Sequence, residues 1–209
     1  PVTQVDAMID KALGDIGNLF DVDRAYIFLY NISAGVITCT NEWHAKGVDS
    51  IKSLTLPISI APFWSSQISR HIPVIISNPD DIPIDAYEEQ ILWARKNVKS
   101  FMGIPMSQED HVLGFIGIDT INREISWPEE MVNQIALLGN IFASAMGRRD
   151  AQRKLEEARE REVEIANGIQ LNLLLGNPPL SSTDYQIETL TIPSKGVDGD
   201  FYDFTLHSN

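Results

Sequence analysis

The side chains that most often carry out chemistry are few and scattered in this sequence. Cys39 is the single cysteine, so no disulfide and no two-thiol redox couple can form within the chain. The histidines at positions 44, 71, 111 and 207 lack the mutual spacing of a metal site. No glycine-rich phosphate loop follows an expected strand, and no nucleophile–base pair is visible. We therefore expect the chain by itself to catalyse no reaction.

Composition and charge narrow the class of protein. Hydrophobic residues make up 44% and charged residues 22%, which is typical of a globular protein with a real core. No apolar run is long enough for a membrane span, and residues 1–10 do not resemble a signal peptide. The formal net charge of −13 disfavours nucleic acid as a partner. With a single cysteine, these features predict a cytoplasmic protein that binds neither membrane nor nucleic acid.

Hydrophobic periodicity predicts an α/β (α+β) fold. Apolar residues at helical spacing predict a first helix over residues 4–20. A capping-box pattern from Asp85 to Glu88 predicts a second helix that ends near residue 97. Pro62 is compatible with the first turn of a short helix within the ambiguous segment 57–66. Runs rich in β-branched and aromatic residues predict strands over 24–30, 36–43, 74–76, 100–106 and 112–121.

A long helix is expected after a second capping box, Ser126 to Glu129. No glycine–proline break follows until residues 176–179, and single glycines cost only about 1 kcal/mol each in a helix. One helix of roughly 45 residues, about 65 Å long, therefore fits this stretch. From residue 148 to 164 its surface carries six basic and six acidic residues, which marks a boundary in composition after residue 147.

The charged part of this helix has two interpretations. Leu155, Ala158, Ile165 and Ile169 follow spacings of three, seven and four, which fit a heptad seam interrupted at Glu162. The first interpretation is a parallel two-stranded coiled coil between two copies of the chain. The alternative is a single solvated helix supported by i,i+4 pairs such as Arg153–Glu157.

The order of elements and several phrases resemble the GAF sensor family over residues 4–147. The phrases are Asp21 to Phe28, Thr40 to Trp43, Ser100 to Met106 and Leu113 to Asp119, followed by Trp127. The resemblance implies a central antiparallel sheet with the first and last helices on one face. A ligand pocket would lie on the other face, under residues 57–97. It also implies a homodimer formed through the terminal helices.

The resemblance makes three aromatic residues candidates for the ligand pocket. Trp43, Phe63 and Trp64 are expected near the GAF cavity, although ordinary core packing explains aromatic residues equally well. Some photosensory GAF domains attach a bilin to a cysteine. Cys39 lacks the neighbouring histidine of that motif, so we interpret it as a half-buried structural thiol. The motif of cyclic-nucleotide-binding GAF domains is not visible.

The last part of the chain resembles the opening of a SpoIIE-type, metal-dependent (PPM) serine/threonine phosphatase. The resemblance rests on Ile169-Gln with Leu173-Leu174, Pro178-Pro179, Tyr185 to Glu188, Pro193, and Gly199 to Asp203. It implies that Asp200 is a ligand of catalytic Mn or Mg ions. Such a site needs several carboxylates, and the family's next aspartate-glycine motif does not occur before Asn209. The metal site would therefore be incomplete in this chain.

These observations predict three parts: a GAF-like sensor at 1–147, a helical linker at 148–175, and the start of a phosphatase domain at 176–209. The expected function is signal transduction. The sensor would detect a small molecule or a partner and act, through a dimeric helix, on a downstream phosphatase domain. The alternative is a dimerisation scaffold that binds no ligand.

Overall fold

A six-stranded antiparallel sheet forms the centre of the computed structural model, which describes residues 2–175. The strand order is β3-β2-β1-β6-β5-β4, so the two hairpins β1–β2 and β5–β6 meet through β1 and β6 in the middle of the sheet. The predicted α+β fold with a central antiparallel sheet is confirmed. The strands are β1 (Arg24–Asn31), β2 (Val36–His44), β3 (Thr55–Pro57), β4 (Val74–Ile76), β5 (Ser100–Gln108) and β6 (His111–Thr120).

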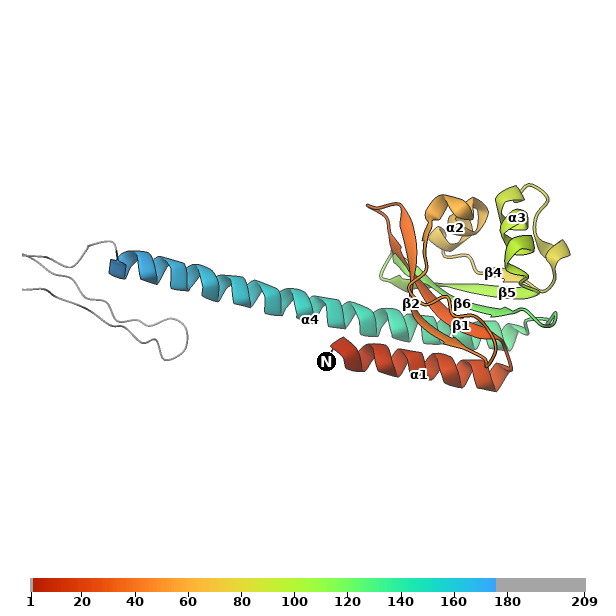
Figure 1. The fold of residues 1–209 in the computed structure, drawn as a ribbon, viewed down its shortest axis with the longest axis horizontal. Helices are drawn as coiled ribbons and strands as arrows, with labels where there is room; N and C mark the ends of the chain where they lie inside the picture. Colours follow the sequence, from red (N-terminus) through yellow and green to blue (C-terminus); the bar gives the residue numbers. More distant parts are fainter. Residues whose placement is uncertain (1, 176–209) are drawn as a thin grey trace, which may run out of the picture. The chain divides into compact units, whose positions relative to one another are not determined.

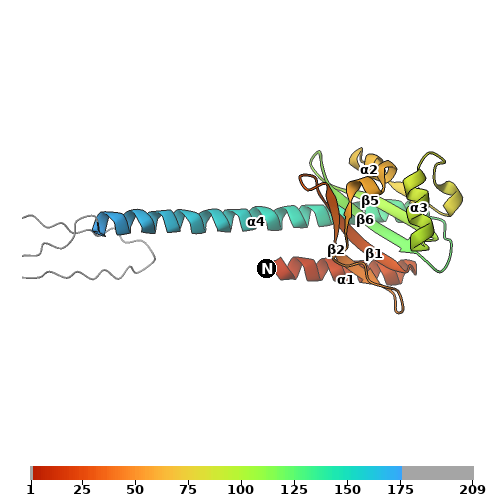
Figure 2. The same cartoon turned by 45° about the horizontal axis from the view of Figure 1, so that its top comes forward.

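Helices cover both faces of this sheet (Figure 1). One face packs against α1 (Val2–Phe20) and against the first part of α4 (Glu129–Leu175), up to Met146. The other face carries α2 (Pro62–Ser69) and α3 (Tyr87–Lys96), as the rotated view in Figure 2 also shows. Two short 3-10 turns, η1 (Ile58–Ile60) and η2 (Pro79–Asp81), belong to the connections around α2 and α3.

Two separate hydrophobic clusters follow from this layering. In the first, Ile9, Leu13 and Ile16 of α1 recur at helical spacing and pack on one face of the sheet with the apolar side of α4. In the second, Ile68 of α2 and Trp93 of α3 pack on the opposite face, with aromatic residues of the strands. The apolar residues of β1, β2, β5 and β6 are divided between the two clusters, so this part of the sheet is buried on both sides.

The region between residues 55 and 97 departs from the prediction. Residues 57–66 contain the end of the edge strand β3, the turn η1 and most of α2, whose first residue is Pro62. The predicted cap at Asp85 is wrong: α3 begins at Tyr87, after Ala86, without a side-chain cap. The capping box of this region lies earlier instead, where Asn78 and Asp81 cap η2. The two candidate capping boxes are both short polar motifs, so the local sequence did not indicate which of them caps a helix.

The chain divides into two compact units after Arg149. In the second unit α4 continues to Leu175, and Arg153 pairs with Glu157 at 2.7 Å, one turn away, as predicted. Leu155, Ile165 and Ile169 are more than half exposed in a single chain. None of the helices in residues 2–175 is long and apolar enough to cross a membrane. Most of the phosphatase-like motifs, including Asp200, lie outside the described residues.

Candidate functional site: an aromatic cavity with one charged end

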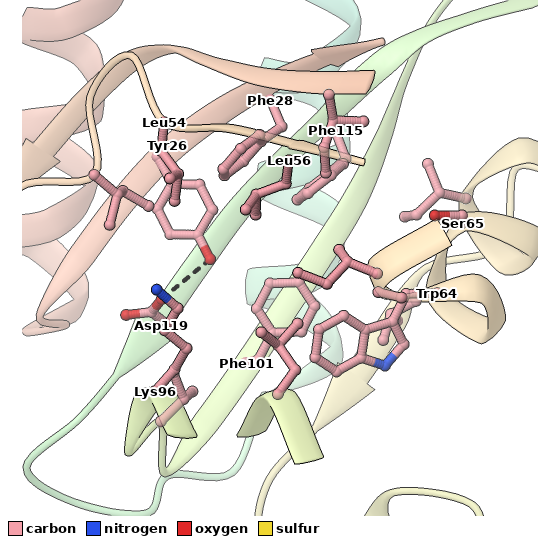
Figure 3. Close-up of a pocket in the computed structure, with 18 of the residues that line it drawn as sticks. Tyr26, Phe28, Leu54, Leu56, Trp64, Ser65, Lys96, Phe101, Phe115 and Asp119 are labelled. Carbon is pink, nitrogen blue, oxygen red and sulfur yellow. Dashed lines mark hydrogen bonds between the residues drawn. The ribbon is translucent and has the colours of Figure 1, made fainter. Parts of the chain in front are cut away.

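A cavity of about 120 Å³ lies between the sheet and the layer formed by α2 and α3 (Figure 3). Its wall on the sheet side is aromatic, because Tyr26 and Phe28 of β1 project onto this face with Phe101 and Phe115. Phe28 and Phe115 stack with ring centroids 5.5 Å apart. Trp64 of α2 stacks on Phe101 at 5.1 Å and closes the cavity from the helical side. Such walls favour an apolar, flat occupant.

One end of the cavity is charged. Arg24, the first residue of β1, donates from Nε and Nη2 to the two carboxylate oxygens of Asp119 in β6, both at 2.9 Å. The hydroxyl of Tyr26 donates to Asp119 Oδ2 at 3.0 Å, as the dashed line in Figure 3 marks. Asp119 is 1% exposed and Arg24 is 8% exposed. The three side chains therefore form a closed network at the buried edge of an otherwise apolar cavity.

The register of the sheet brings this network together. Arg24 and Asp119 are directly opposite each other in the β1–β6 pair, so their side chains share one face. Gly117 lies opposite Tyr26 and leaves room for its ring, since a Cβ there would come within 2.1 Å of that ring. Burial, followed by the negative charge of Asp119, raises the pKa of Tyr26 well above its usual value. The phenol therefore stays protonated and keeps donating to Asp119.

The layer that covers the cavity depends on a buried carboxylate. Glu89 of α3 is fully buried, and its Oε1 accepts the backbone N–H groups of Phe63 at 2.7 Å and Trp64 at 3.2 Å. These donors belong to the first turn of α2, where a negative charge is favourable. Glu89 Oε2 and the indole nitrogens of Trp64 and Trp93 are buried without a partner among the described residues. Unpaired buried polar atoms make this layer costly to keep closed.

The three predicted pocket residues lie in different places. Trp64 lines the cavity, whereas Phe63 packs in the same cluster without lining it. Trp43 must be corrected: it lies on the opposite face, against Gly14 and Gly17 of α1. The reason is a bulge in β2, where the partner of Ile27 is Asn41 and that of Phe28 is Cys39. The extra residue reverses the alternation of side chains, so Trp43 faces the helix.

Sequence patterns do not single out the residues that define the charged end and the cover. The patterns predict only that Arg24, Tyr26 and Asp119 belong to strands and Glu89 to a helix. A signal was present, since Asp119 ends a run of apolar residues and Arg24 begins another. A charge within a buried strand needs a partner, and the two charged residues would have been natural candidates to pair.

Cys39 and a metal site are the two remaining candidates for chemistry in the sequence. The thiol of Cys39 is buried, donates toward the carbonyl of Asn41 at 3.5 Å and does not line the cavity. Burial, followed by the charge of Glu42, raises its pKa to about 12. Within residues 2–175, no three histidine, cysteine, aspartate or glutamate side chains are placed to hold a metal ion. The predicted ligand Asp200 is not among these residues.

Comparison with known proteins agrees with this architecture. The sequence profile of the GAF domain matches residues 4–146, more than half of the chain. The chain belongs to the GAF domain family. A curated relative, the methanogenesis regulatory histidine kinase FilI of Methanothrix harundinacea, is 30% identical over 177 residues. This alignment covers 78% of the present chain but only 19% of FilI, so the chain spans a small part of that protein.

Solved GAF domains share the fold at low sequence identity. The blue-light absorbing form of the Thermosynechococcus elongatus PixJ GAF domain superposes with a TM-score of 0.62 at 12% identity, covering 76% of this chain and 94% of the other. The GAF domain region of a putative membrane protein from Geobacter sulfurreducens PCA gives 0.56 at 18% identity, covering 69% and 94%. These similarities describe the GAF fold of this chain and not its ligand.

Proposed function

We propose that the GAF domain is a sensor that holds a small molecule in the aromatic cavity and takes part in signal transduction. The observation that carries this proposal is the cavity itself, which combines apolar aromatic walls with a single charged end at Arg24 and Asp119. Small-molecule sites typically have this composition, with few polar groups that fix orientation. The regulatory relative FilI supports a role in signalling.

The cover of the cavity offers a route for entry. Glu89 Oε2, Trp64 Nε1 and Trp93 Nε1 gain hydrogen bonds to water whenever α2 and α3 separate from each other. Opening this layer therefore costs less than opening a fully satisfied core. An occupant that packs against Trp64 would restore the closed arrangement and shift the population toward it.

A polar chain links the cavity to the helical face. Ile51 lines the cavity, and the next residue, Lys52, pairs with Asp10 of α1 at 2.8 Å. Asp10 also accepts from Asn41 at 2.8 Å. One turn earlier on α1, Asp6 pairs with Arg149 of α4 at 2.5 Å. We propose that displacement of the loop at Ile51 reaches α1 and the end of the first unit through these contacts.

Binding to the cavity is tested by thermal unfolding with a panel of small aromatic and aliphatic molecules. Leu56 lines the cavity, so Leu56→Trp should fill it and abolish any ligand-induced rise in melting temperature. Ile32→Trp is the matched control, since Ile32 is 74% exposed in the turn between β1 and β2 and does not line the cavity. A rise that survives in Leu56→Trp would place the ligand elsewhere. Native mass spectrometry of freshly purified protein would reveal a retained ligand.

For the output, we propose control of a metal-dependent serine/threonine phosphatase domain of which residues 176–209 are the beginning. The support is the ordered set of motifs that ends with Gly199 to Asp203. The name of FilI instead describes a histidine kinase, so the output of the relative differs from this proposal. A longer protein in which residues 176–209 open a complete phosphatase domain should hydrolyse phosphoserine with Mn or Mg. Autophosphorylation on histidine without such hydrolysis would contradict the phosphatase.

We also propose that the protein is a cytoplasmic homodimer. Met8 and Leu19 of α1 and Leu137 and Ile141 of α4 are apolar and more than half exposed in one chain, which favours a second copy as their cover. The scaffold alternative shares this dimer but needs no ligand. Sedimentation analysis measures whether the chain forms a dimer. Ligand screening separates the sensor from the scaffold, because a scaffold would show no ligand-induced rise in melting temperature that Leu56→Trp abolishes.

A further inference from the structure

The charged end of the cavity keeps hydrogen-bond donors that the protein does not use. Arg24 is buried to all but 8% of its surface, and Asp119 occupies its Nε and Nη2. No acceptor in the described part of the chain binds the remaining terminal nitrogen, Nη1. Arg24 lines the cavity, so this donor is available to a molecule inside it. A guanidinium with a free edge is well suited to carboxylate oxygens.

Lys96, in the last turn of α3, adds a positive charge at the same end. It lines the cavity, and three residues later the backbone N–H of Lys99 donates to the carbonyl of Thr120, the neighbour of Asp119, which places the end of α3 at this end of β6. Figure 3 labels Lys96 among the residues that line the cavity. Among residues 2–175, no carboxylate forms an ion pair with its ammonium. Among the side chains that line the cavity, the charges of Arg24 and Asp119 cancel each other and Tyr26 is neutral, so Lys96 leaves a net positive charge. The buried carboxylate of Glu42 also acts on Arg24, but it does not line the cavity and accepts from the backbone N–H groups of Ile51 and Lys52. A cation as ligand is therefore disfavoured, and an anion is favoured.

The dimensions and walls of the cavity restrict the rest of the ligand. A cavity of roughly 150 Å³ with apolar walls accommodates one benzene molecule. The present cavity of about 120 Å³ is somewhat smaller, which limits the apolar body to about one ring at most. Phe28, Trp64 and Phe101 surround this space with ring faces and edges. One net positive charge matches a singly charged acid better than a phosphate.

On the basis of the proposed sensing function, we propose that the GAF cavity binds small monocarboxylic acids with a body of about one ring. The carboxylate lies between Arg24 Nη1 and the ammonium of Lys96, and the apolar body packs between Phe28, Trp64 and Phe101. Asp119 is not a ligand contact in this arrangement. It holds Arg24 in place and neutralises its charge. The preference for an anionic ligand over a neutral or cationic one then depends on the free N–H groups of Arg24 and on the ammonium of Lys96.

Three probes of similar shape and different charge test the ligand class: benzoate, benzyl alcohol and benzylamine. Titration calorimetry on the 209-residue chain should give the tightest binding for benzoate and the weakest for benzylamine. Lys96→Gln should weaken benzoate about tenfold, as expected for loss of one charge-assisted contact, and should change benzyl alcohol by less than about twofold. Arg95→Gln is the matched control, because Arg95 is the neighbouring exposed cation of α3 and does not line the cavity.

The results separate the two proposals. If benzyl alcohol or benzylamine binds as tightly as benzoate, the carboxylate preference is wrong while the sensing cavity stands. The same conclusion follows if Lys96→Gln and Arg95→Gln have equal effects on benzoate. If none of the three probes binds at millimolar concentration, or if binding persists in Leu56→Trp, both the ligand class and the cavity as a sensor site fall.

Discussion

The carboxylate of Glu89 in α3 accepts the backbone N–H of Phe63 in α2 at 2.7 Å, although 26 residues separate them in the sequence. The same oxygen accepts the N–H of Trp64 at 3.2 Å. One buried side chain thus accepts two backbone N–H groups in the first turn of α2, the helix that carries Trp64. This contact joins the two helices of the cover into one unit.

Replacing Glu89 should loosen this unit. Glu89→Ala leaves two buried backbone donors without an acceptor, so we expect the free energy of unfolding to fall by about 1–3 kcal/mol. Glu89→Gln keeps an acceptor and should lose less than half of that. Urea denaturation measures both, with Glu88→Ala, at an exposed position of the same turn, as the control. Equal losses for Glu88→Ala and Glu89→Ala would contradict the capping role.

The ion pair between Arg24 and Asp119 gives a second prediction. Asp119→Asn keeps the shape of the side chain but leaves the guanidinium of Arg24 buried without a counter-charge. Removing one partner of a buried pair typically costs about 3–5 kcal/mol, and we expect a loss in this range. Chemical denaturation should show it, whereas Asp85→Asn on an exposed loop should change stability by less than about 0.5 kcal/mol. A loss below about 1 kcal/mol for Asp119→Asn would mean that the pair is not a structural requirement.

The contact between Trp43 and α1 predicts the effect of adding one methyl group. A Cβ at Gly17 would come within 2.0 Å of the Trp43 ring, so Gly17→Ala should destabilise the domain by about 1–3 kcal/mol. At Gly139 in α4 the nearest atom would be 3.5 Å away, and Gly139→Ala should be neutral or stabilise by up to about 1 kcal/mol. Thermal unfolding followed by circular dichroism compares them. A neutral Gly17→Ala would contradict this placement of Trp43.

The buried thiol of Cys39 predicts both low reactivity and a dependence of stability on pH. Burial raises its pKa from 9.0 to about 12, so a thiol reagent at pH 8 should label the native protein only after unfolding. Because the unfolded thiol ionises first, the contribution of Cys39 to stability should be lost as the pH rises from about 9 to about 12. Cys39→Ala should remove this part of the alkaline decline. Rapid labelling of the native wild type would contradict the burial.

The proposed coiled coil predicts different effects for two neighbouring apolar residues of α4. Ile165 belongs to the heptad seam and is 63% exposed in one chain, whereas Val163 lies outside the seam and is 46% exposed. Ile165→Glu should weaken self-association at least tenfold, because it buries a charge in the dimer. Val163→Glu should leave it nearly unchanged. Analytical ultracentrifugation over a range of concentrations decides, and equal effects would favour the solvated single helix.

Much of the fold was predictable because it depends on local periodicity. The apolar stripe of α1, the β-branched runs of the strands and the absence of a stop signal in α4 are properties of neighbouring residues. They gave helix and strand positions close to those observed, including a final helix that ends at Leu175. The failures lie where local signals compete, at the start of α3 and in residues 57–66. There, packing against the sheet decides which turn forms.

The site was less predictable than the fold, because its residues come together only in the folded structure. The sequence by itself determined the family resemblance, the layers and an aromatic character for the region around Trp64. Tertiary structure decided that Arg24 and Asp119 pair across β1 and β6, and that Glu89 caps α2. It also decided, through one extra residue in β2, that Trp43 faces α1 and not the cavity. Strand register and bulges set which face a side chain occupies, and a single sequence does not state the register.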